Sequence, residues 1–72
     1  MAEYNILFLD LNKRLSILKA RLPYLGPNVS DSKKEGLRKR IDTLLKELDN
    51  DYSEGKYLTE FDSKIAEVES EF

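Results

Sequence analysis

The stretch that decides the fold is YNILFLDLNKRLSILKARLPYL, residues 4–25. Its apolar residues follow one another at spacings that alternate four and three without a break: Tyr4, Phe8, Leu11, Leu15, Leu18, Leu22 and Leu25. This alternation is the heptad pattern of a helix that packs along one seam. Pro23 should end the helix, because the residue before a proline is pushed out of the helical region. We therefore expect a first helix over about residues 3–22.

A second helix is expected over about residues 32–49. Its apolar residues keep the same alternation of four and three: Leu37, Ile41, Leu44 and Leu48. Ser30, Asp31 and Ser32 are all candidate N-caps. Ser32 is preferred among them, because Glu35 three residues later completes a capping box.

A third helix is expected from about residue 60 to residue 72. Thr59 and Asp62 resemble a capping box with the shorter acid. The apolar residues that follow are spaced by four, three and four: Phe61, Ile65, Val68 and Phe72. Between the second and third helices, residues 50–58 collect Asp, Asn, Ser and Gly, which weaken helix propensity.

No segment shows the strict period-two alternation of a β-strand, so the predicted fold class is all-α. The preferred architecture is an antiparallel three-helix bundle with heptad-like packing, formed by residues 1–72 as one small domain. The alternative is a long helical hairpin that self-associates, which would form if the last two helices ran together through residues 50–58.

The composition excludes most enzyme chemistries. The 72 residues include no cysteine and no histidine, which removes disulfides, zinc fingers, iron–sulfur ligation and thiol or imidazole catalysis. A chain this short also offers little volume for a pocket. We expect no enzyme activity, no metal, no cofactor and no small-molecule substrate.

The sequence also predicts a cytoplasmic protein that does not enter a membrane. No stretch approaches the roughly 18 consecutive apolar residues of a membrane-spanning helix. The first residues, Met-Ala-Glu-Tyr-Asn, carry an acid where a signal peptide would carry basic residues.

The first helix carries a second stripe on the side opposite its heptad seam. The second stripe consists of Ile6, Leu9, Lys13, Ile17 and Ala20, at spacings of three, four, four and three. A helix that is apolar on two sides is normally buried between neighbours. Either the other two helices straddle the first one and cover both stripes, or the second stripe is an interface with another protein or a second copy of the chain.

Charge is strongly segregated along the chain. Residues 1–12 hold two acids and no base, residues 13–46 hold ten bases and three acids, and residues 47–72 hold two bases and nine acids. The net charges of these segments are −2, +7 and −7, which add to the total of −2. The preferred interpretation is that the acidic end packs beside the basic middle, so that opposite charges complement one another.

A basic patch at the start of the second helix offers a different interpretation. The basic patch consists of Lys33, Lys34, Arg38, Lys39 and Arg40. Clustered Lys and Arg side chains supply the salt-sensitive contacts to phosphates in nucleic-acid binding. The negative total charge and the acidic end of the same small chain argue against this interpretation.

Residues 49–60 come close to the calcium loop of an EF-hand but do not fit it. With Asp49 at the first position, Asp51, Ser53 and Glu60 fall on ligand positions. Gly55, however, stands one position after the place where the loop requires glycine. A turn between two helices is the preferred interpretation.

These observations predict a small helical protein–protein interaction module or accessory subunit. It would act by burying the second stripe against another protein or a second copy of the chain. The alternative is a nucleic-acid-associated regulator, or an accessory subunit of a replication or transcription enzyme, that uses the basic patch.

Overall fold

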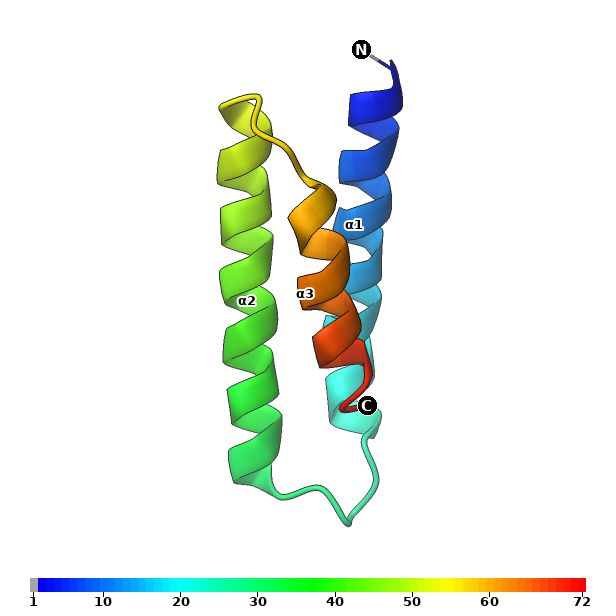
Figure 1. Cartoon of the computed structure of the whole chain (residues 1–72). Helices are drawn as coiled ribbons and strands as arrows, with labels where there is room; N and C mark the ends of the chain where they lie inside the picture. Colours follow the sequence, from blue (N-terminus) through cyan, green and yellow to red (C-terminus); the bar gives the residue numbers. More distant parts are fainter. Residues whose placement is uncertain (1) are drawn as a thin grey trace.

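Three α-helices run along one long axis, each antiparallel to the helix before it in sequence (Figure 1). The computed structural model describes residues 2–72. Its helices are α1 (Ala2–Arg21), α2 (Asp31–Ser53) and α3 (Thr59–Glu69), with a short 3-10 helix, η1 (Leu22–Tyr24), after α1. Every pair of α-helices is in contact, and the molecule measures 43 × 17 × 16 Å. The protein is therefore an all-α three-helix bundle.

α1 ends one residue earlier than the expected end at Leu22. The chain continues into η1, where Pro23 stands in the first turn. Proline is tolerated there because the first N–H groups of a helix have no intrahelical partner. The Leu25 N–H closes η1 by donating to the Leu22 carbonyl oxygen at 3.2 Å.

The expected capping box at the start of α2 is wrong, because Ser30 is the N-cap. The Ser30 hydroxyl accepts a hydrogen bond from the Lys33 N–H at 3.1 Å. Ser32 lies inside α2, as its second residue, and so cannot be the cap, and the carboxylate of Glu35 accepts hydrogen bonds from Arg38 instead. Of the three candidates, the structure therefore uses Ser30, the residue just before the helix.

α2 runs to Ser53, four residues beyond its expected end, and then stops at Gly55. Gly55 has a φ of 72°, in the left-handed region that closes many helices. The Gly55 N–H donates to the Tyr52 carbonyl oxygen at 3.2 Å, and the Lys56 N–H donates to that of Asp51 at 2.9 Å. These two bonds form a Schellman motif, so the alternative in which the last two helices run together is wrong.

α3 begins at Thr59, but Thr59 is not its cap. Leu58 occupies the N-cap position and provides no side-chain hydrogen bond; its side chain is buried in the core instead. The helix ends at Glu69 rather than at the last residue. Phe72, beyond the helix, packs partly buried against the core, with the Arg21 guanidinium 5.8 Å from the centre of its ring.

The core lies along the line where the three helices meet. Its buried residues are Leu11, Leu15, Leu18, Leu22, Leu37, Ile41, Leu44, Leu48, Leu58, Phe61, Ile65 and Val68. Apart from Leu58, all of them belong to the three heptad series of the sequence. No side-chain nitrogen or oxygen atom is buried without a hydrogen-bond partner in the described residues. Within residues 2–72, no helix is long and apolar enough to cross a membrane.

Candidate interaction surface

The second stripe faces solvent on the side of α1 that points away from α2 and α3. Its aliphatic side chains are largely exposed, with 64% of Ile6, 63% of Leu9 and 47% of Ile17 accessible. Lys13 and Ala20 are also exposed. The alternative in which the other helices straddle α1 and cover both stripes is therefore wrong, because both helices pack against the same seam.

Polar contacts on the edge of α1 that borders α2 help to hold the stripe outward. The Lys19 Nζ donates to the Asp42 Oδ1 at 2.7 Å. Nearer the N-terminus, the Tyr52 hydroxyl donates to the Asn5 Oδ1 at 2.5 Å. These contacts lie near the two ends of the same helix edge, so a rotation of α1 about its axis would break both.

The edge of α1 that borders α3 is held by Arg14. Its guanidinium donates to the Glu69 Oε1 at 2.7 Å and to the Asp62 Oδ1 at 2.5 Å. The pKa of Arg14 is raised above its ordinary value, chiefly by the hydrogen bond to Glu69 and then by that to Asp62. With both edges of α1 engaged, the second stripe stays on the face opposite the core.

An aromatic cluster joins the first turns of α1 to the end of α2. The ring of Tyr52 stacks on Phe8, with 3.9 Å between centroids, and on Tyr4, with 5.3 Å. The Tyr4 hydroxyl donates to the carbonyl oxygen of Lys56 at 2.7 Å. Desolvation, followed by the proximity of Tyr52 and Asp51, raises the pKa of Tyr4. Both tyrosines thus bridge core and solvent, as amphipathic rings at helix ends often do.

Two charged residues accompany the stripe. Lys13 stands at its centre, and Asp10 lies three residues earlier, near the edge that borders α3. Both are exposed, and neither takes part in an ion pair within residues 2–72. The sequence pattern singled out Lys13 but missed Asp10, although its spacing from Lys13 could have indicated a neighbour on the helix surface.

The basic patch lies along the first half of α2, and its two arginines have acidic partners. Arg38 pairs with Glu35 and with Asp42, and Arg40 pairs with Glu71 beyond α3. Lys33, Lys34 and Lys39 form no ion pair in the described part of the chain. Two of the five positive charges of the patch are therefore balanced within the chain.

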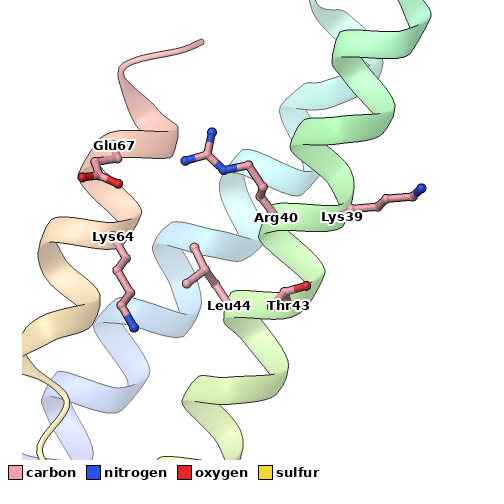
Figure 2. A pocket seen from close by; sticks show the side chains of 6 residues that line it. All are labelled: Lys39, Arg40, Thr43, Leu44, Lys64 and Glu67. Carbon is pink, nitrogen blue, oxygen red and sulfur yellow. The ribbon is translucent and has the colours of Figure 1, made fainter.

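A groove of about 300 Å³ separates the patch from α3 (Figure 2). Arg40 and Leu44 of α2 extend toward α3, and Lys64 and Glu67 stand on the opposite wall, whereas Lys39 points away from the groove. The Lys64 Nζ lies 5.2 Å from the centre of the Phe61 ring. Because the walls carry both signs of charge, this groove is not a uniform site for phosphates.

The predicted turn at residues 49–60 is only partly a turn. Asp49, Asp51 and Ser53 belong to the last turns of α2, so they cannot wrap around an ion as the ligands of an EF-hand loop do. Among the described residues, no group of three or more Asp or Glu side chains is arranged to hold a metal ion.

One further pocket, of about 520 Å³, was not expected from the sequence. It is lined by Tyr4, Gly55, Lys56 and Tyr57, and Tyr57 is 89% exposed. Lys56 already pairs with Glu54, at 2.9 Å. The pocket is thus an open notch beside the turn after α2.

Comparison with protein-family models, with curated proteins and with solved structures finds no match to this chain.

Proposed function

We propose that the protein is a helical interaction module that docks through the second stripe of α1. The observation that carries this proposal is the exposure of Ile6, Leu9 and Ile17 on one face of a helix whose opposite face forms the core. Single exposed apolar residues are normal on a protein surface, but several aligned on one helix face, interrupted here only by Lys13, are typical of an interface.

Burial of the stripe supplies the driving force for docking. Completely burying an aliphatic side chain contributes roughly 1.5 to 3 kcal/mol, and the three aliphatic residues of the stripe are already partly covered. Their combined contribution is therefore modest, and association itself costs several kcal/mol. The proposal accordingly describes reversible docking, in which a partner contributes apolar side chains of its own.

The arrangement supports nucleic-acid binding less well. Arg38 and Arg40 are engaged by carboxylates, which would have to be displaced before these arginines could contact phosphates. Acidic side chains also line the surface beside the patch, including Glu67 and Glu71. Both features oppose the approach of a phosphate backbone.

Site-specific photo-crosslinking in cells tests the docking surface. A photo-reactive residue replaces Ile17 in one variant and Ser63, an exposed residue of α3, in the control variant. We expect a crosslinked protein, either a second copy or another chain, from position 17 and not from position 63. That protein is then purified, and its affinity for the unmodified chain is compared with its affinity for Ile17→Glu.

The expected loss of affinity for Ile17→Glu is about tenfold or more, as for a residue central to an interface. Because Ile17 is 47% exposed, the thermal melt of Ile17→Glu at low protein concentration should stay close to that of the unmodified chain. Equal crosslinking from positions 17 and 63, or unchanged affinity of Ile17→Glu, would refute the docking surface.

A further inference from the structure

The second stripe is symmetric along the helix. Its spacings of three, four, four and three read the same from either end, with Lys13 at the centre. The stripe extends over 15 residues, from Ile6 to Ala20, which corresponds to about 21 Å of helix. A two-fold symmetric interface needs a surface that is complementary to its own reversed copy.

We propose that the occupant of the stripe is a second copy of this chain, with the two α1 helices antiparallel and the two-fold axis at Lys13. This inference rests on the proposed docking function and names its partner. In this register, residues at equal distances on either side of Lys13 face each other across the interface. Ile6 then packs against Ala20 of the other copy, and Leu9 packs against Ile17.

The sizes of the facing residues suit this register. The large side chain of Ile6 meets the small side chain of Ala20, which lets the helices approach closely at both ends. Leu9 and Ile17 form two larger contacts nearer the centre. Large residues that face small ones fill the space between helices efficiently.

The charges beside the stripe also suit an antiparallel pair. Two Lys13 side chains meet at the axis, and each has Asp10 of the other copy about 4.5 Å away along the helix direction. On the same edge, Glu3 of one copy comes within about 3 Å, along the helix direction, of Arg21 of the other. None of these four residues forms an ion pair within residues 2–72.

A parallel pair would keep the separation of about 4.5 Å between Asp10 and Lys13 along the helix direction, but it would not match the charges at the helix ends. Lys13 would again meet Lys13 at the centre of the interface, but Glu3 and Arg21 would stand at opposite ends of the helix pair. Opposite charges at the rim of an interface contribute more to orientation than to affinity. The antiparallel arrangement is therefore the one that Glu3 and Arg21 favour.

Disulfide trapping tests the orientation, because the chain contains no cysteine of its own. We expect Leu9→Cys chains mixed with Ile17→Cys chains to form the mixed disulfide under mild oxidation. Leu9→Cys alone should remain largely unlinked, and so should a mixture of Ser63→Cys with Ile17→Cys. Efficient linking of Leu9→Cys to itself would instead indicate parallel helices and overturn the proposed orientation.

Charge reversal tests the complementarity without a crosslink. Sedimentation equilibrium is measured from about 10 µM to about 1 mM, a range that covers weak interfaces of this size. Lys13→Glu alone and Asp10→Lys alone should each weaken dimerisation about tenfold. The double variant Lys13→Glu/Asp10→Lys should restore it, because both pairs regain opposite charges.

The outcomes separate this inference from the docking function. Suppose that the unmodified chain stays monomeric up to the highest concentration while position 17 still crosslinks to a different protein. The proposed dimer is then wrong, but the proposed docking surface is still supported. If the chain stays monomeric and position 17 crosslinks to nothing, both proposals fail. A dimer that persists in Ile17→Glu would place the interface elsewhere and overturn this inference.

Discussion

Leu9 and Leu15 are the same residue type on the same helix, and their surroundings are opposite. Leu15 is completely buried in the core, whereas Leu9 is 63% exposed on the second stripe. The contribution of a leucine to the free energy of unfolding depends on how much of its apolar surface is removed from water. The two leucines thus distinguish residues that hold the fold from residues that are available to a partner.

Replacing each leucine by alanine should separate these roles. Leu15→Ala should lower the free energy of unfolding by about 2 to 5 kcal/mol, because it leaves a cavity in the core. Leu9→Ala should change it by less than about 0.5 kcal/mol in the monomer. Urea unfolding at low protein concentration measures both. A loss for Leu9→Ala as large as that for Leu15→Ala would contradict the assignment of the stripe to the surface.

The helix ends are fixed in different ways. α2 begins where the Ser30 hydroxyl accepts the Lys33 N–H, and it ends where Gly55 adopts a φ of 72°. α3 begins without a side-chain cap, and the burial of Leu58 fixes its start instead. A side-chain cap thus fixes the start of α2, a left-handed glycine fixes its end, and a buried leucine fixes the start of α3.

Two serines near the start of α2 provide a matched test of the observed cap. Ser30→Ala should lower the free energy of unfolding by about 1 kcal/mol, because the Lys33 N–H loses its acceptor. Ser32→Ala should have little effect or a slight stabilising one, since alanine is the better helix former inside a helix. Thermal or urea unfolding of the two variants shows which of the two serines caps α2. The reverse order of effects would reinstate the capping box at Ser32.

For the whole molecule, the segregated charges become contacts between helices. Arg14 of α1 pairs with Asp62 and Glu69 of α3, and Arg40 of α2 pairs with Glu71. The acidic end of the chain thus lies against the basic middle, as the charge pattern led us to prefer. Exposed ion pairs contribute little individually, so their main effect is on the relative orientation of the helices.

The ion pairs of Asp42 and Glu35 should make the stability depend on pH. The hydrogen bond from Lys19 lowers the pKa of Asp42, and that from Arg38 lowers the pKa of Glu35. Folded chains therefore bind fewer protons than unfolded ones as the pH drops below the ordinary values of about 3.9 for Asp and 4.3 for Glu. The stabilisation is complete above these values and is lost as the pH falls through the lowered pKa values.

Thermal melts between about pH 7 and pH 2 measure this dependence. The Tm should fall on acidification, and Asp42→Asn should have a lower Tm near pH 7 and a smaller fall. Asp49→Asn is the control, since Asp49 is an exposed carboxylate of α2 without an ion pair in the described residues. An identical fall for the unmodified chain and Asp42→Asn would show that Asp42 does not contribute.

The sequence by itself determined the number of helices, their core faces and the regions where they break. The spacing of Leu11, Leu15 and Leu18 specifies the buried side of α1, and Pro23 and Gly55 restrict the backbone wherever they stand. These properties are local, because they follow from the helical period and from the conformations that individual residues can adopt. They could therefore be read without knowledge of the other helices.

Only the tertiary structure decided which apolar face of α1 stays exposed. The second stripe remains in solvent because α2 and α3 both pack on the opposite side of α1. This outcome depends on where the other helices lie after folding. The spacing of Ile6, Leu9 and Ile17 could predict a second apolar face, but only the positions of the other helices could show that nothing within the chain covers it.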